Sequence, residues 1–376
     1  MNLLPEPTGF VPPAYPFDVP PEVVAAAGAV EGGAVDLSRG IPCDPVPDVV
    51  AAALAGDPDP ARPYPPSIGT PDLLDAVVGW CGRRIGVALQ PTQVGACVGT
   101  KELVTGLPHL LRLRDPVRDT VLYPAVAYPS YEMGAVLAGC RAVPVPLDDG
   151  WRIDLSAIDE ADAERALCLW VNTPGNPAGA LDDLEAAAEW GRARGVPVLS
   201  DECYVEFTWS EPPRSILQHG TDGVLAVHSL SKRSNLAGLR VGFYAGDPDL
   251  AWYLRETRKH QGFLVPGPAQ VAGAASLRDQ DHVEAQAGRY RRRLEALLEV
   301  LGALGLEAAM PEGGFYLWVA APGGDEVALC LRLATDLGVL TSPGTTFGPD
   351  GAGWVRIAAV VPDDHLDRVR ARAGLA

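Results

Sequence analysis

The sequence contains almost no lysine. Its 30 basic residues include only three lysines, Lys101, Lys232 and Lys259, and arginine supplies the rest. An arginine stays charged in proteins, whereas the pKa of a lysine falls readily on burial, so that its amine can act as a nucleophile near neutral pH. Lys232 lies in the run SLSKRS at the end of an expected strand. Either the three lysines survive a coding preference for arginine by chance, or the neighbours of Lys232 give it a chemical role.

Other missing features exclude several classes of protein. The seven cysteines are scattered, with no CxxC pair and no metal-like cluster, which suits reduced thiols in a cytoplasm. The net charge of −18 argues against a general surface for nucleic acid or an anionic membrane. No apolar run approaches the ~20 residues of a membrane span, and the start, MNLLPEPTGFVPP, lacks the pattern of a signal peptide. We therefore expect a globular cytoplasmic protein without a metal site.

The order of the expected elements indicates a doubly wound α/β fold. Prolines throughout residues 1–21 favour an extended arm. From about residue 70, short apolar runs alternate with helical patterns, which is typical of a mostly parallel sheet covered on both faces. The first of these helices has Thr70 as its expected N-cap and Pro71 at its first position. Strands are expected within residues 94–99, 119–124, 141–147, 166–172, 196–202, 223–230 and 239–246.

The pattern changes after residue 263. Two long helical patterns, at 268–278 and 282–304, lead into expected strands near 313–321, 338–343 and 353–360. We predict an N-terminal arm with part of the small domain at 1–45, a large domain at 46–265 and a small C-terminal α/β domain at 266–376.

Polar residues follow four of the expected strands at their carboxyl ends, the edge where doubly wound sheets bind ligands. They are Gly99, Thr100 and Lys101 after residues 94–98, Asn172 and Asn176 after 166–171, Asp201 and Tyr204 after 196–200, and Ser229, Ser231 and Lys232 after 224–228. The Gly99-Thr100-Lys101 turn runs straight into a helix, whose free N–H groups and dipole favour an anion. One such turn is weak evidence, but four strand ends with complementary groups predict a site.

The run SLSKRSNLAGLRVG resembles the lysine signature of class I/II aminotransferases, the fold-type I enzymes that use pyridoxal 5′-phosphate. Other motifs stand in the order of that family: YPPSIGTPDL, GTKE, YPSY, NTPGNPAG, SDECY, SLSK with GLR, and VRI. The resemblance extends from SRGIP near residue 39 to WVRIA near residue 354. Within the family, HSLSKRSNLAGLR, SDECY and RKHQGFLVPGPAQ look most like the actinobacterial succinyldiaminopimelate aminotransferases of lysine biosynthesis. The resemblance implies a homodimer with a large, mostly parallel doubly wound domain and a smaller C-terminal α/β domain.

The resemblance also implies roles for the residues around the cofactor ring. Lys232 would bind the cofactor aldehyde covalently and then act as the general base on the substrate α-carbon. Asp201 would pair with the pyridine nitrogen, so that the ring can accept electrons. Tyr204 and Asn176 would hydrogen-bond the phenolic oxygen, and Tyr128 would stack on the ring.

The family match further implies a phosphate site, a substrate site and a residue shared between subunits. The phosphate would be held by Gly99, Thr100, Lys101, Ser229, Ser231 and Arg240. Tyr64 would reach the phosphate of the neighbouring subunit. Gly40 lies where relatives approach the substrate, and Arg356 would bind the substrate α-carboxylate through both of its terminal nitrogens.

Two positions depart from the family pattern. Ala178 stands where relatives commonly have threonine, and the turn should survive because Pro177 and Gly179 supply its geometry. Arg39 stands next to Gly40, where a smaller or apolar residue is expected. Arg39 either faces a second carboxylate of the substrate or turns outward to Asp36 or Asp44.

Several functions share these motifs. The favoured activity transfers an amino group from a dicarboxylic donor such as glutamate to an acceptor like N-succinyl-amino-oxopimelate. Two alternatives stay open: an aminotransferase of another pathway, such as one of specialised metabolism, and a cofactor-dependent C–S lyase. The same fold also occurs as a sensor fused to a DNA-binding helix-turn-helix, but the proline-rich arm and the net charge of −18 oppose that role.

Overall fold

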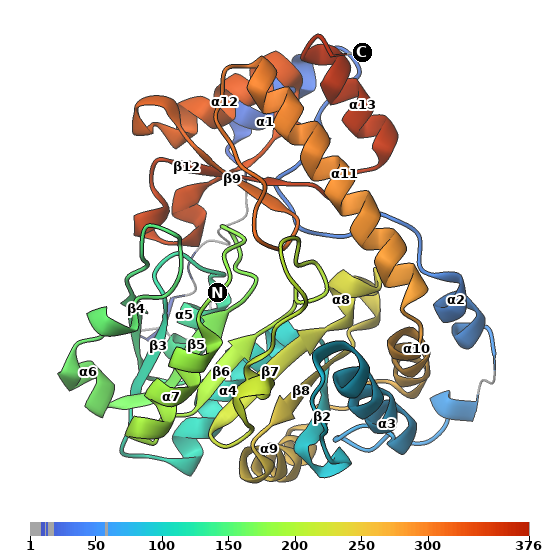
Figure 1. Cartoon of the computed structure of the whole chain (residues 1–376), viewed down its shortest axis with the longest axis vertical. Coiled ribbons are helices and arrows are strands. Elements are labelled where there is room, and N and C mark those ends of the chain that lie inside the picture. The colour runs from blue at the N-terminus through green and yellow to red at the C-terminus, as the bar shows by residue number, and fades with distance from the viewer. Residues whose placement is uncertain (1–8, 12, 14–18, 57–58, 376) are drawn as a thin grey trace, which may run out of the picture.

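The computed structural model describes residues 9–11, 13, 19–56 and 59–375 (Figure 1). Most of the arm predicted for residues 1–21 lies outside the described residues. Pro21 is the first residue of helix α1 (Pro21–Ala29), a position at which its missing N–H costs nothing.

A seven-stranded sheet forms the wider, lower part of the molecule in Figure 1. Its spatial order is β2-β8-β7-β6-β5-β3-β4. Strand β8 runs in the direction opposite to that of the other six strands, which are parallel to one another. The strands are β2 (Val94–Cys97), β3 (Thr120–Pro124), β4 (Arg141–Val145), β5 (Ala166–Asn172), β6 (Val198–Asp201), β7 (Val224–Ser229) and β8 (Gly242–Gly246). Each lies within a run expected to be a strand, so the predicted α/β fold with a mostly parallel sheet is confirmed.

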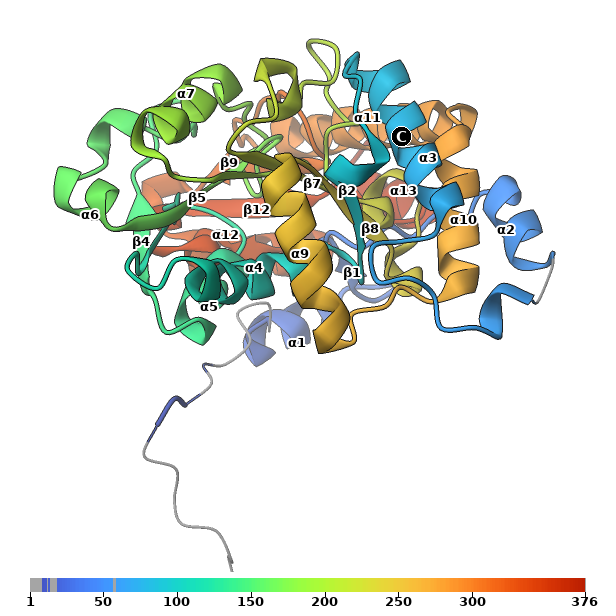
Figure 2. The same cartoon turned by 90° about the horizontal axis from the view of Figure 1, so that it is seen from below.

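Helices cover both faces of this sheet, as Figure 2 shows from below. Side chains alternate between the faces: Leu169 and Val171 of β5 pack with one set of helices, and Cys168 and Trp170 with the other. The first set comprises α3 (Pro71–Trp80), α7 (Leu184–Arg194) and α10 (Gly267–Arg278). The second set comprises α4 (Thr100–Arg114), α5 (Ser130–Leu137) and α9 (Pro248–Gln261). Three shorter helices are α2 (Asp48–Leu54), α6 (Glu160–Glu164) and α8 (Leu230–Arg233).

The predicted N-cap of α3 is confirmed, because the Thr70 side chain accepts a hydrogen bond from the Leu73 backbone N–H at 3.3 Å. Helix α10 packs against α3 and the large sheet rather than with the C-terminal strands. We therefore propose that the large domain ends after α10, near residue 279, in place of residue 265.

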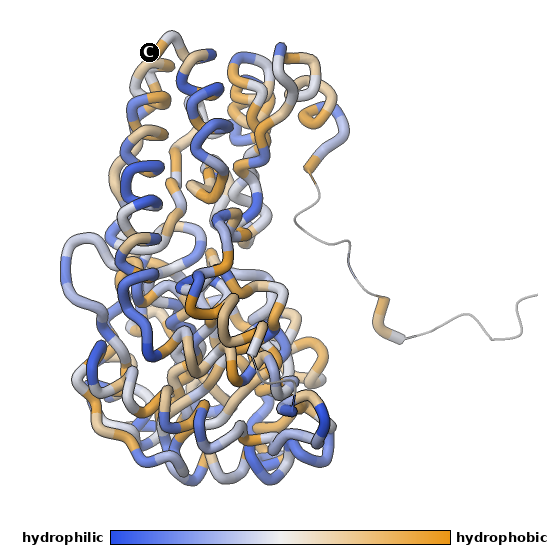
Figure 3. Tube along the Cα trace, turned by 90° about the vertical axis from the view of Figure 1, so that its right-hand side faces the viewer, coloured by the Kyte–Doolittle hydropathy of each residue, from blue (hydrophilic) through white to orange (hydrophobic). Residues whose placement is uncertain are grey.

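A smaller unit lies above the large sheet in Figure 1. Its three-stranded antiparallel sheet has the order β11 (Ser342–Pro343), β12 (Trp354–Ala358), β9 (Tyr316–Ala320). Strand β1 (Val35–Asp36), from near the start of the chain, pairs in parallel with β10 (Val339–Leu340). Helices α11 (Asp281–Ala303), α12 (Glu326–Leu337) and α13 (Asp363–Arg372) pack against the strands of this smaller unit. Figure 3 shows apolar and polar residues alternating along its helices. The N-terminal segment thus completes a unit otherwise built from the end of the chain.

No helix in the described part of the chain is both long and apolar enough to cross a membrane.

Candidate active site

The carboxyl ends of the parallel strands open into a cavity of about 480 Å³ beneath the smaller unit. Every predicted site residue except Gly99 and Tyr64 lines it. These residues are Arg39, Gly40, Thr100, Lys101, Tyr128, Asn176, Asp201, Tyr204, Ser229, Ser231, Lys232, Arg240 and Arg356. The lining holds five cationic side chains and one carboxylate, although the whole chain carries a net charge of −18. The cavity is therefore a local cationic site suited to an anionic ligand.

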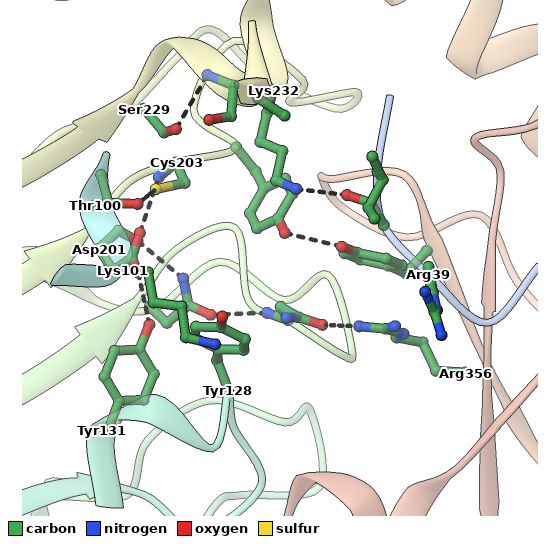
Figure 4. Close-up of a pocket in the computed structure, with 18 of the residues that line it drawn as sticks. Arg39, Thr100, Lys101, Tyr128, Tyr131, Asp201, Cys203, Ser229, Lys232 and Arg356 are labelled. Carbon is green, nitrogen blue, oxygen red and sulfur yellow. Dashed lines mark hydrogen bonds between the residues drawn. The ribbon is translucent and has the colours of Figure 1, made fainter. Parts of the chain in front are cut away.

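Lys232 lies in the short helix α8, directly after β7, and its amine points into the cavity (Figure 4). The amine donates a hydrogen bond to the carbonyl oxygen of Gly40. Burial is the main cause that lowers the pKa of Lys232 to about 8, and the charges of Arg356 and Arg240 act in the same direction. The side chain can therefore supply a neutral amine near physiological pH, as a nucleophile or a general base requires.

Asp201 is the last residue of β6 and is the buried carboxylate of the site. Its Oδ2 accepts a hydrogen bond from the Tyr131 hydroxyl at 2.9 Å, and its Oδ1 accepts one from the Cys203 backbone N–H at 3.2 Å. Burial raises the pKa of Asp201, and these hydrogen bonds and the Lys232 charge oppose that rise. The carboxylate is thus fixed by neutral donors, and no arginine of the described residues forms an ion pair with it.

One end of the cavity gathers hydrogen-bond donors. Helix α4 begins at Thr100 after Gly99, whose φ of 70° is left-handed. A Cβ on Gly99 would lie 2.1 Å from Nη2 of Arg240, so glycine is needed for this close approach. Arg240 itself has a left-handed φ of 55°, which is costly for a residue with a side chain and indicates that its position is imposed by the fold. With the hydroxyls of Ser229 and Ser231, this end suits a phosphate group.

Arg356 occupies the opposite end of the cavity, 2% exposed (Figure 4). Its Nη1 donates to Asn176 Oδ1 at 2.8 Å and its Nη2 to the Ser38 carbonyl oxygen at 2.6 Å. Its guanidinium carbon lies 4.3 Å from the ring centre of Tyr316 and 4.6 Å from that of Phe347. These contacts orient a planar cation that suits a carboxylate.

Arg39 lies at the mouth of the same end (Figure 4). Its side chain is 56% exposed, and its Nε is 3.9 Å from Asp36 Oδ2. The alternative pairing with Asp44 is wrong, because Asp44 forms a buried ion pair with Arg293 at 2.7 Å. Arg39 therefore combines features of both interpretations: it lines the cavity and also approaches Asp36.

Tyr64 and Gly99 are the predicted residues that do not line the cavity. Gly99 lies directly behind the Arg240 guanidinium, and Arg240 itself lines the cavity. Tyr64 is 93% exposed, which leaves its side chain accessible to another molecule.

Several lining residues escaped the sequence analysis: Ile41, Tyr131, Cys203, Ala237 and Tyr316. Tyr131 could have been found, because it lies three residues after Tyr128 in YPSY, within one helical turn. Asn172 lines the cavity as well. Its Oδ1 accepts from the Asn176 N–H and its Nδ2 donates to the Asp201 carbonyl oxygen, both at 2.9 Å, so it also fixes the loop around Asn176.

Comparisons with known proteins identify the family of this chain. The family model described as aminotransferase class I and II matches residues 33–372. The 4-dedimethylamino-4-oxo-anhydrotetracycline transaminase OxyQ of Streptomyces rimosus is 40% identical, over 96% of this chain and 98% of that protein. An LL-diaminopimelate aminotransferase of Aquifex aeolicus is 35% identical, over 88% of each chain.

Solved structures give the same result. An aminotransferase from Neisseria meningitidis superposes with a TM-score of 0.87 at 26% identity, over 96% of both chains. A probable N-succinyldiaminopimelate aminotransferase from Thermus thermophilus superposes with a TM-score of 0.83 at 33% identity, over 94% of this chain and 98% of that one. The chain belongs to the class I and II aminotransferases, which depend on pyridoxal 5′-phosphate.

Proposed function

We propose that this aminotransferase moves the amino group of glutamate to N-succinyl-2-amino-6-oxopimelate, as an N-succinyl-L,L-2,6-diaminopimelate:2-oxoglutarate aminotransferase of lysine biosynthesis. The observation that carries the proposal is the presence of two arginines, Arg356 and Arg39, at one end of the cavity. Glutamate and the succinylated pimelate each carry more than one carboxylate, and guanidinium groups bind carboxylates in planar pairs. The names of the Aquifex and Thermus relatives, an LL-diaminopimelate aminotransferase and a probable N-succinyldiaminopimelate aminotransferase, support diaminopimelate-like substrates.

The cavity residues fit pyridoxal 5′-phosphate. Thr100, Ser229, Ser231 and Arg240 would hold the phosphate, because they gather donors around a helix start and the close approach at Gly99. Lys101 stands 5.8 Å above the Tyr128 ring and would add charge there. The bound cofactor supplies an aldehyde and an electron-accepting ring.

The places of the side chains in the cavity support the following roles at the ring. Lys232 would hold the cofactor covalently and then move a proton at the substrate α-carbon, for which its lowered pKa is suited. Asp201 would pair with the ring nitrogen and keep it protonated, while Tyr204 and Asn176 would donate toward the phenolic oxygen. Arg356 and Gly40 bind the substrate carboxylate, and Arg39 binds the distal one.

We further propose a cytoplasmic homodimer in which the exposed Tyr64 of each chain completes the phosphate site of its partner. The side chain is 93% exposed in the single chain. A two-fold interface would present it twice, once to each site.

A half-reaction screen tests the substrate proposal. Single amino acids are mixed with the holoenzyme, and the visible absorbance of the bound cofactor is followed. Glutamate and N-succinyl-L,L-2,6-diaminopimelate should convert the cofactor, and alanine should react poorly. Release of ammonia, a keto acid and a thiol from cystathionine would instead establish a C–S lyase.

A second candidate is supported by OxyQ, which matches over 98% of its own length. In this case the acceptor would be a polycyclic ketone of the kind that the OxyQ name describes. Amination of such a ketone by glutamate, with no reaction of the succinylated pimelate, would favour this candidate and overturn the first.

A further inference from the structure

Tyr316 contacts two residues to which the proposed function gives different roles, Tyr204 and Arg356. It is the first residue of β9, belongs to the smaller unit and is 2% exposed. Its hydroxyl oxygen lies 2.9 Å from that of Tyr204, and its ring lies 4.3 Å from the guanidinium carbon of Arg356. One side chain therefore joins the residue proposed for the phenolic oxygen to the residue proposed for the substrate carboxylate.

The packing around Tyr316 fixes the place of its hydroxyl. A Cβ on Gly40 would lie 1.8 Å from the Tyr316 oxygen, so the absence of a side chain at Gly40 makes room for the hydroxyl. The Tyr316 ring also packs against Tyr204 and Phe315, with ring centres 5.6 and 4.8 Å away. The packing beside Gly40 and Phe315 therefore keeps the Tyr316 hydroxyl next to that of Tyr204.

We propose that Tyr316 is a positioning residue that acts through Tyr204, by donating its hydroxyl hydrogen to the Tyr204 oxygen. Each phenol has one hydrogen to donate. If Tyr204 donates its hydrogen into the cavity, its oxygen is left as the acceptor for Tyr316. Hydrogen bonds in such a chain polarise one another, so Tyr316 makes Tyr204 a stronger donor.

The proposal rests on the role proposed above for Tyr204 but not on the identity of the amino acceptor. Its test therefore uses the holoenzyme without substrate, so that a wrong acceptor cannot affect the result. The visible absorbance of the bound cofactor is titrated against pH, which reports the apparent pKa of the resting site.

Tyr290 offers a matched control. It belongs to the same buried aromatic cluster as Tyr316 and is 0% exposed. Tyr290 does not line the cavity, and no hydrogen bond joins its hydroxyl to a lining residue among the described residues. Tyr290→Phe and Tyr316→Phe thus remove the same atom from the same cluster, with only the second change reaching the site.

We expect Tyr316→Phe to raise the apparent pKa by about 0.4 to 1 unit, the equivalent of one ordinary hydrogen bond. Tyr290→Phe should leave the titration unchanged. In a Tyr204→Phe background, Tyr316→Phe should add no further shift, because the chain is already broken. The KM for the amino donor should stay within about twofold, because phenylalanine keeps the ring beside Arg356.

An unchanged titration of Tyr316→Phe overturns the proposal, even if its melting temperature falls, because that result describes a purely structural residue. Equal shifts in Tyr316→Phe and Tyr290→Phe also overturn it. So does a shift that persists undiminished in the Tyr204→Phe background, since Tyr316 would then act by another route.

Discussion

The amine of Lys232 donates a hydrogen bond to the carbonyl oxygen of Gly40, 192 residues earlier in the sequence. Gly40 follows β1 of the smaller unit, whereas Lys232 follows β7 of the large sheet. The contact therefore places the reactive amine where the two units meet. Burial of this amine is the main reason for its lowered pKa.

That pKa predicts how the apoenzyme captures its cofactor. The neutral amine attacks the aldehyde, and the pKa of about 8 replaces the ordinary value of 10.5. The capture rate, followed by the cofactor absorbance, should therefore rise as the pH increases through about 8 and level off above it. A rate that still rises steeply between pH 9 and 11 would show a lysine that is not shifted.

Lys232→Ala should abolish transamination while cofactor is still retained without a covalent bond, because the phosphate contacts are intact. Lys259→Ala is the control, since Lys259 is paired with Glu256 on the surface. It should keep normal activity. Near-normal turnover by Lys232→Ala would contradict the assignment.

Tyr131→Phe should weaken the action of Asp201. The lost hydrogen bond to a carboxylate contributes about 1.5–3 kcal/mol, which corresponds to a fall in kcat of ~10- to 150-fold if it is fully expressed in the transition state. Asp201→Asn should cause a larger fall, of several orders of magnitude, because the charge itself is lost. Measuring kcat for both variants checks that Asp201→Asn causes the larger fall. An active Asp201→Asn protein would refute the role proposed for Asp201.

Arg39→Ala should discriminate between substrate classes. The side chain lies at the mouth and is 56% exposed, so its contact with a distal carboxylate is partly screened. We expect kcat/KM for glutamate to fall about 10-fold, which is near the lower end of the range of effects caused by losing a charge-assisted hydrogen bond. Alanine, which has no distal carboxylate, should be almost unaffected. Equal losses for both amino acids would indicate a disturbed loop instead.

Tyr64 makes a prediction about assembly. Mixed dimers of Tyr64→Phe and Lys232→Ala chains should contain one site with both defects and one with neither. Their activity should exceed that of both parent proteins once subunits have exchanged. Mass spectrometry should first show that the subunits have exchanged. If activity then fails to recover, each site is built within one chain.

The sequence predicted the large sheet well because parallel strands that are buried on both faces leave continuous apolar runs, such as Ala166–Asn172. It also predicted Asp201 and Lys232 as neighbours, since both follow strands of the same sheet. Tyr316 could not be found in this way. In the sequence it is an ordinary apolar position of a strand, and only the packing of distant segments turns its hydroxyl toward the cavity. The boundary that we propose near residue 279 rests on the packing of α10 against α3, which a helical pattern in the sequence does not reveal.

Under the proposed function, the cofactor and substrate halves of the cavity come from different parts of the chain. Residues 99–240 would supply the cofactor half, whereas residues near 40 and 316–356 would supply the substrate half. Substitutions in the second group should then change the amino acceptor without disturbing the residues around the ring. This separation offers a physical route by which one scaffold could serve different acceptors, and the relatives to which this chain is similar include an LL-diaminopimelate aminotransferase and the OxyQ transaminase.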